Sequence, residues 1–140
     1  MVPGPLLACM AAASAFYHPT TQALPAIYGV EAGRVGIVRH NANGSDDLGV
    51  MQINTLWILP LSHGTRVPVT RLRRALINDA CFNVAVAGAI LRIYLHESGD
   101  QLTAIGFYHS HTPALRDAYV LRVLASSPLG ARAGPAATRH

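Results

Sequence analysis

Apolar positions recur at spacings of three and four along much of the chain, which is the pattern of amphipathic helices. The longest such stretch covers residues 80–97, with Asp79 placed to cap its start and Gly99 to end it. We expect this segment to be the buried central helix. Further helices are predicted at residues 5–17, 55–61, 70–76, 101–109 and 113–125.

A helix is also predicted between Pro19 and Gly33, and it places an acidic residue beside apolar ones. Thr20 or Thr21 can cap its start. Its apolar stripe ends at Glu31, where a carboxyl group is desolvated and its pKa rises toward that of a working general acid. The same pattern is also typical of a structural or solvent-facing glutamate, so the spacing alone leaves both interpretations open.

The period changes in the middle of the chain, where two short apolar runs flank a turn-rich stretch. The runs are residues 37–40 and 48–53, and the turn at 41–47 contains Asn43 and Gly44, a pair typical of tight hairpins. This pattern predicts a small β-hairpin region in an otherwise helical chain. The predicted fold class is therefore α+β and mainly helical.

Proline and glycine set the remaining boundaries. Pro60 is expected to end the short helix before it, and residues 63–68 are expected to form a loop. From residue 126 onward Pro, Gly and Ala accumulate without apolar spacing. We therefore expect one domain at residues 1–125, followed by a disordered tail at 126–140.

The 140 residues are 51% hydrophobic and 13% charged, which fits one folded domain and excludes a highly charged disordered chain. No run approaches the roughly 20 uninterrupted apolar residues of a membrane span, so we expect no membrane insertion. The net charge is +4 and all 11 basic side chains are Arg, which favours an anionic partner. Nucleic acid is disfavoured, because only Arg71, Arg73 and Arg74 cluster, and they fit a solvated helix face.

Two cysteines, Cys9 and Cys81, stand far apart and lack the spacing of a zinc site. They form either two buried thiols or a disulfide, which would be worth about 4 kcal/mol on the chain-entropy model and is typical of an oxidising compartment. Seven His residues could suggest a metal site. His109 and His111 stand two apart, but no acidic residue completes a ligand set with them, so we expect no metal and no cofactor.

Several segments resemble the lytic transglycosylases of the soluble transglycosylase and goose-type lysozyme-like superfamily. They are residues 26–33, which contain Glu31, the turn at 41–47, the run at 48–54, the helix start at 78–84 and the aromatic motif at 104–110. Their order and spacing match over roughly residues 6–124. The resemblance implies a lysozyme-like fold with the hairpin region beside an active-site cleft. The middle and late motifs look most like the subfamily that accompanies bacterial secretion and conjugation machines.

The resemblance implies that Glu31 is the single catalytic acid of a peptidoglycan lytic transglycosylase. It would protonate the glycosidic oxygen between N-acetylmuramic acid and N-acetylglucosamine and then act as base, so that the muramic acid 6-hydroxyl closes a 1,6-anhydro ring. The residues that match the substrate-binding motifs are Gly49, Met51, Gln52, Asn83 and Tyr108. The subfamily also pairs cysteines at the positions of Cys9 and Cys81, which implies a disulfide. Ala32 departs from the serine that follows the acid in many members.

Other interpretations remain for these residues. Met51 has the alternation of a core strand residue, Gly49 suits a turn and Asn83 suits a cap or a packed core position. A second enzyme class is a lysozyme-type muramidase hydrolase, with Asp46 or Asp47 as second carboxylate, although both also fit ordinary turn chemistry. A third class is a non-catalytic wall-binding or adaptor domain.

The resemblance implies a periplasmic protein that acts on peptidoglycan glycan strands and serves a type III or type IV secretion or conjugation machine. We expect a monomer that binds no nucleic acid. Leu6, Leu7 and Ala8 precede Cys9 as in a lipoprotein processing box, but no Arg or Lys stands before them. We therefore expect export without a signal peptide evident in this chain.

Overall fold

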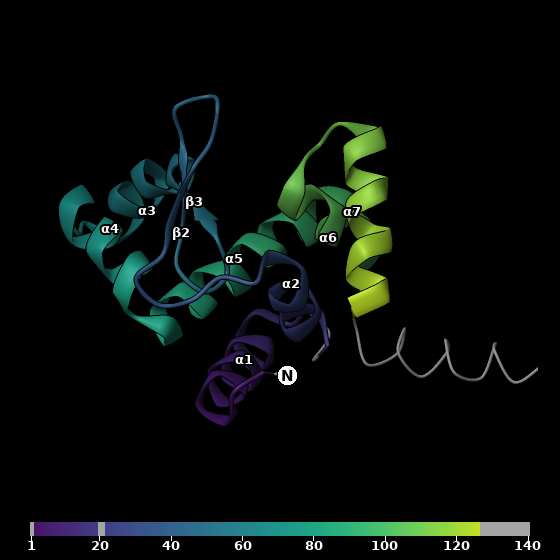
Figure 1. Ribbon diagram of the computed structural model, residues 1–140, viewed down its shortest axis with the longest axis horizontal. Coiled ribbons are helices and arrows are strands. Elements are labelled where there is room, and N and C mark those ends of the chain that lie inside the picture. Colours follow the sequence, from purple (N-terminus) through teal and green to yellow (C-terminus); the bar gives the residue numbers. More distant parts are fainter. Residues whose placement is uncertain (1, 20–21, 127–140) are drawn as a thin grey trace, which may run out of the picture.

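The computed structural model describes residues 2–19 and 22–126 (Figure 1). Its helices are α1 (Gly4–Tyr17), α2 (Ala23–Glu31), the short 3-10 helix η1 (Thr55–Trp57), α3 (Ile58–Thr65), α4 (Val69–Asn78), α5 (Ala80–Ser98), α6 (Gln101–His109) and α7 (Pro113–Ser126). Its strands are β1 (Val38–His40), β2 (Asp46–Leu48) and β3 (Ile53–Asn54). The predicted fold class, α+β and mainly helical, is confirmed.

The long helix α5 runs through the middle of the molecule (Figure 1). It packs against α1, α4 and α6, and α7 packs in turn on α6 and α2. The sheet, α3 and α4 lie toward one end of α5, whereas α6 and α7 lie at its other end (Figure 1). In the described part of the chain, no single helix has the length and hydropathy needed to cross a membrane. In that part, only α4 and α5 together reach that length and hydropathy, as a pair bent by 106°.

Two side-chain caps and one glycine set the limits of α5 and the start of α6. Asp79 accepts a hydrogen bond from Phe82 N at 3.0 Å, and Gly99 ends α5 with a φ of 72°. Asp100 accepts from Thr103 N at 2.9 Å and starts α6. Each carboxylate satisfies an N–H group that the first helical turn leaves without a partner. The predicted limits at Asp79, Gly99 and Asp100 are confirmed.

The strands form an antiparallel sheet in the order β1-β2-β3. The turn between β1 and β2 is shorter than predicted, because Asn41 N donates to Ser45 O at 2.8 Å and this backbone bond ends the turn at Ser45. Asp46 and Asp47, expected in the turn, therefore belong to β2. Asp47 lies opposite Arg39 in the register, which brings this acid into the sheet.

Helix α3 is longer than predicted. The expected stop at Pro60 is wrong, because Pro60 is the third residue of α3 and lies in the first turn, where a missing N–H leaves no helical bond unmade. The helix continues to Thr65 and ends at Arg66, whose φ of 60° is left-handed. The loop expected at 63–68 therefore begins later.

Two other predicted helix starts differ or stay open. Thr70 was expected to cap α4 but lies inside it, because α4 begins at Val69, directly after Pro68. The predicted caps of α2, Thr20 and Thr21, lie outside the described residues. The segment ahead of Glu31 is helical, as predicted.

The last described helix reaches one residue past the expected domain limit. Ser126 ends α7, and its Oγ donates to Ala26 O of α2 at 2.9 Å. This contact joins α7 to the helix that carries Glu31. The rest of the tail expected at 126–140 lies outside the described residues.

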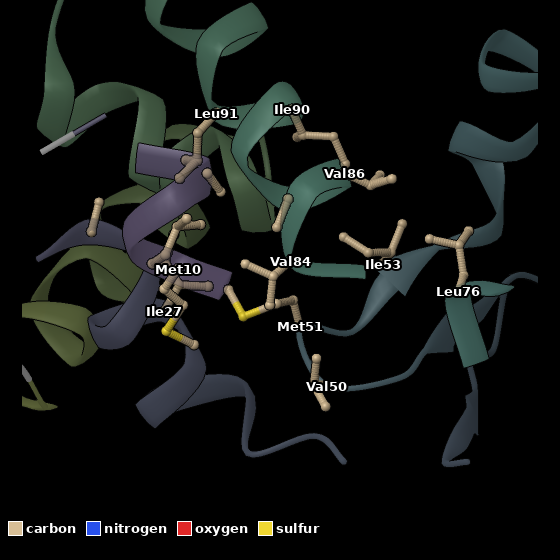
Figure 2. Close-up of a cluster of buried hydrophobic side chains, with 14 of the residues drawn as sticks. Met10, Ile27, Val50, Met51, Ile53, Leu76, Val84, Val86, Ile90 and Leu91 are labelled. Atoms are coloured by element: carbon tan, nitrogen blue, oxygen red, sulfur yellow. The ribbon is translucent and has the colours of Figure 1, made fainter. Parts of the chain in front are cut away.

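One buried core joins the helices to the sheet (Figure 2). Met10 of α1, Ile27 of α2 and Val84 of α5 belong to this cluster and are fully or almost fully buried. Met51 and Ile53 extend the cluster toward the sheet. The core therefore fixes α2 and the loop before β3 relative to each other.

A disulfide links the first helix to the central one. Cys9 of α1 and Cys81 at the start of α5 are bonded, with their Cα atoms 5.2 Å apart. Of the two alternatives that composition left open, the disulfide is confirmed. It is the pairing that the resemblance implies.

Candidate active site

A cleft of about 440 Å³ lies between the sheet and the helices α2, α5 and α6. Its lining residues are Glu31, Asn41, Ala42, Asn43, Ser45, Asp47, Gln52, Ile53, Asn54, Trp57, Ile90, Tyr108 and His109. Three of the predicted site residues, Glu31, Gln52 and Tyr108, meet in this cleft. Most of the other lining side chains carry amide, hydroxyl or ring groups, which suit contacts with sugars.

Glu31 is the last residue of α2 and is half-buried in the cleft. Burial raises the pKa of its carboxyl group, and the negative charge of Asp47 raises it further. A hydrogen bond from Tyr119 and the positive charges of Arg122 and Arg39 oppose these effects without cancelling them. The pKa of Glu31 therefore lies above the ordinary value of 4.5, which favours a carboxyl group that can donate a proton.

Tyr119 of α7, which was not predicted as a site residue, donates from its hydroxyl to Glu31 Oε2 at 2.6 Å. Its buried ring stacks on His109, with 4.9 Å between the ring centroids, and the Arg122 guanidinium lies 5.3 Å from its centroid. Burial and the charge of Glu31 raise the pKa of Tyr119, so its hydroxyl remains a donor. Its spacing to Val123 is typical of a core residue, and 88 positions separate it from Glu31, so the sequence held no signal of the contact.

Gln52 lies in the loop between β2 and β3, and Tyr108 of α6 forms a hydrogen bond to the same loop. Gln52 adopts a φ of 55°, a left-handed conformation that is uncommon for residues other than glycine. Its Nε2 donates to Gly49 O at 2.9 Å. Tyr108 donates from its hydroxyl to Met51 O at 2.7 Å, and burial raises its pKa. Strained backbone of this kind clusters at functional sites, which supports a site role for Gln52.

Gly49, Met51 and Asn83 lie behind the cleft wall and are not among its described lining residues. Asn83 is fully buried, and its Nδ2 donates to Leu48 O and Leu76 O, each at 2.8 Å. Its Oδ1 accepts from Met51 N at 2.9 Å. A Cβ at Gly49 would collide with Leu76 O and with the Asn83 side chain. These contacts give the three residues structural roles, and their contact with substrate stays a prediction.

The two adjacent acids of β2 are placed differently, since successive residues of a strand point to opposite faces. Asp47 lines the cleft and accepts from Asn54 Nδ2 at 3.0 Å. Asp46 instead pairs with His40 Nδ1 at 2.6 Å and with Arg73 Nη2 at 3.0 Å. The hydrogen bonds from His40 and Arg73 lower the pKa of Asp46. Arg73 therefore has a partner on the sheet, while its side chain stays 39% exposed and Arg71 and Arg74 of the same cluster are exposed, as expected for a solvated helix face.

Histidines near the cleft take part in ring stacking and pairing. Among residues 2–19 and 22–126, no three His, Cys, Asp or Glu side chains gather in a group that could hold a metal ion. His109 stacks on Tyr119 at the edge of the cleft, and burial, followed by the charge of Arg122, lowers its pKa. His111 lies outside the cleft lining that is described and contacts Glu97 Oε1 at 2.9 Å.

No family model matches the chain. The chain is similar to the invasion protein IagB of Salmonella typhimurium, in strains SL1344 and LT2, and of Salmonella typhi. Each comparison gives 29% identity over 109 residues, which is 77% of this chain and 65% of the relative. The chain thus matches less than two thirds of the length of these curated relatives.

Proposed function

We propose that this chain is a peptidoglycan lytic transglycosylase that cleaves the β-1,4 bond between N-acetylmuramic acid and N-acetylglucosamine. The observation that carries the proposal is Glu31, a carboxyl group with a raised pKa that accepts a 2.6 Å hydrogen bond from Tyr119 beside a polar cleft. The similarity to IagB and the resemblance of the motifs around Glu31 and Gln52 support it.

In the first step the protonated Glu31 carboxyl donates its proton to the glycosidic oxygen, and the bond from that oxygen to C1 of the muramic acid breaks. The carboxylate then takes the proton of the muramic acid 6-hydroxyl, and O6 attacks C1. A 1,6-anhydro ring forms, no water is consumed, and Glu31 regains its proton. Tyr119 orients the carboxyl group throughout, because its own raised pKa keeps it a donor. Gln52 and Tyr108, which line the cleft, are assigned to sugar contacts.

A second candidate function is a muramidase hydrolase, and one observation favours it. Asp47 lines the same cleft as Glu31, where a second carboxylate could act on water or on the sugar. Asp46 does not suit this role, because His40 and Arg73 already hold its carboxylate. The two-carboxylate reaction would therefore use Glu31 and Asp47.

Mass analysis of the soluble products of purified wall polymer tests the proposal. A transglycosylase releases muropeptides with a 1,6-anhydro end, each lighter by one water than the reducing product of a hydrolase. We expect the anhydro product, and none from a matched preparation of Glu31→Gln. Reducing ends alone would support the hydrolase, whereas an absence of products with retained polymer binding would support a wall-binding domain.

We also propose that the protein acts in the periplasm and locally opens the wall for a secretion or conjugation apparatus. The disulfide between Cys9 and Cys81 supports an oxidising compartment, and the relatives carry the name invasion protein. After cell fractionation without reductant, the protein should be recovered in the periplasmic fraction with Cys9 and Cys81 unmodified by an alkylating agent. Recovery in the cytoplasmic fraction with both thiols alkylated would contradict this location.

A further inference from the structure

Arg39 of β1 makes a set of contacts near the acid that the proposed reaction does not use. Its Nη1 donates to Glu31 O at 2.8 Å, and its Nη2 donates to Ala32 O at 3.2 Å. Nη1 also donates to Gln52 Oε1 at 3.3 Å. The Arg39 guanidinium therefore joins the backbone at Glu31 and Ala32 to the Gln52 side chain, which belongs to the loop between β2 and β3 and faces the end of α2.

The end of α2 requires a partner of this kind. Glu31 is the last helical residue, and the carbonyl groups of a final turn have no helical N–H group to accept from. Ala32 follows with a φ of 50°, a left-handed conformation in which glycine is the usual residue. Ala32 N donates to Tyr28 O at 2.8 Å and closes the helix. A cation here also complements the negative C-terminal end of the helix dipole.

Two hydrogen bonds thus position Glu31, one at its side chain and one at its main chain. Tyr119 bonds its carboxylate oxygen, and Arg39 bonds its main-chain carbonyl oxygen. Arg39 is exposed and lies opposite Asp47 in the register, so it shares the face of the sheet that Asp47 presents, although it is not among the described residues that line the cleft. Its planar fork reaches three acceptors at once, a geometry that the compact ammonium group of Lys does not reproduce.

We propose that Arg39 is a positioning residue: it clamps the C-terminal end of α2 to Gln52 and so sets the separation between Glu31 and the facing loop. The role in catalysis rests on the proposed function, in which Glu31 is the acid. A displacement of about 1 Å in a catalytic group can cost on the order of 100-fold in rate. Loss of the clamp therefore lowers kcat more than it raises KM.

The test compares Arg39→Lys and Arg39→Met with Arg34→Met, an exposed arginine just beyond α2 that serves as the matched control. On soluble glycan strands, both Arg39 variants should lose about 10-fold or more in kcat, with KM changed by less than about threefold. Arg39→Met also removes a positive charge that lowers the pKa of Glu31, so the basic limb of its pH profile moves to higher pH. Arg39→Lys keeps the charge and leaves that limb in place.

A readout that needs no turnover separates this proposal from the function on which it rests. Exchange of the Ala32 amide hydrogen should speed up at least about 10-fold in Arg39→Met and stay unchanged in Arg34→Met, while both proteins melt cooperatively. A folded Arg39→Met protein that keeps both its kcat and its Ala32 protection overturns the clamp. A parent protein that never cleaves wall polymer overturns the proposed function, and in that case unchanged Ala32 exchange in Arg39→Met still overturns the clamp.

Discussion

The two sides of the cleft treat polar groups differently. On the helical side, Glu31 meets the hydroxyl of Tyr119 among buried and stacked rings. On the sheet side, Ser45 Oγ donates to Asn43 Oδ1 at 2.6 Å and accepts from Asn41 Nδ2 at 3.1 Å, so amides and a hydroxyl satisfy one another. The helical side therefore suits proton transfer, whereas the turn on the sheet side presents neutral amide and hydroxyl groups.

The carboxyl groups of the two sides make the same contrast. Burial raises the pKa of Glu31, whereas hydrogen bonds from His40 and Arg73 lower the pKa of Asp46. Both are ordinary acids, and their surroundings decide which of them can act as a proton donor. Substitutions on either side of the cleft therefore test whether Glu31 on the helical side donates the proton and the acids of β2 do not.

The largest effect is expected for Glu31→Gln, which keeps the size of the side chain but cannot donate a proton. Release of muropeptides should fall about 100-fold to 10,000-fold or more. The thermal melt of the variant should stay cooperative, since a neutral amide suits a half-buried position better than a charged group does. Unchanged release of muropeptides by a folded Glu31→Gln variant would refute the role of Glu31 as the proton donor.

Tyr119→Phe removes the hydroxyl from the same side and should lower kcat by about 10-fold through lost orientation of the acid. Its hydrogen bond lowers the pKa of Glu31, so its loss moves the basic limb of the pH profile to higher pH. Tyr28→Phe, on α2 but outside the described cleft lining, is the matched control. Equal profiles for the two variants would show that Tyr119 only packs.

Asp47→Asn changes the sheet side where it faces the acid. The loss should stay well below the roughly 100-fold expected for a missing catalytic base. Removing the negative charge lowers the pKa of Glu31, so the basic limb moves to lower pH, opposite to the shift of Tyr119→Phe. If Asp47→Asn is instead as inactive as Glu31→Gln and the parent releases reducing ends, the hydrolase is correct.

The smallest effect is expected for Asp46→Asn, because Asp46 lies on the far face of β2. Its pKa is lowered in the folded state, so its pairs with His40 and Arg73 contribute stability at neutral pH that is lost as pH falls through that lowered pKa. The variant should keep nearly all activity, with a slightly lower Tm that converges with the parent at strongly acidic pH. A large loss of activity would contradict this expectation, because it would mean that the face of the sheet away from the cleft takes part in the reaction.

Local signals predicted the helices well where a single side chain sets a boundary. Asp79, Asp100 and Gly99 act within three residues of the helix ends they define, so their effects are readable along the chain. The helix end predicted at Pro60 was wrong because proline is also favoured in the first turn of a helix, which is where Pro60 lies in α3. Asp46 and Asp47 were expected in the turn, but backbone and side-chain bonds within residues 41–45 close the turn at Ser45 and leave both acids in β2.

The cleft was predictable in part, through the motifs around Glu31, Gln52 and Tyr108, which the structure brings together. The supporting contacts were not. Tyr119 approaches Glu31 across 88 positions of sequence, and Arg39 bonds backbone carbonyl groups, which leave no mark on residue identity. Only the packing of α7 on α2 and the register of β1 with β2 bring these side chains to the acid.

The bond between Cys9 and Cys81 closes the chain between them into a covalent ring. The ring contains Glu31 and the exposed turn at residues 42–44, whereas Tyr108 and Tyr119 lie on the branch beyond it. A single protease cut in that turn would open the ring but leave one connected molecule. Refolding of the nicked protein should therefore stay first-order, with a rate independent of protein concentration until a reductant separates the two pieces.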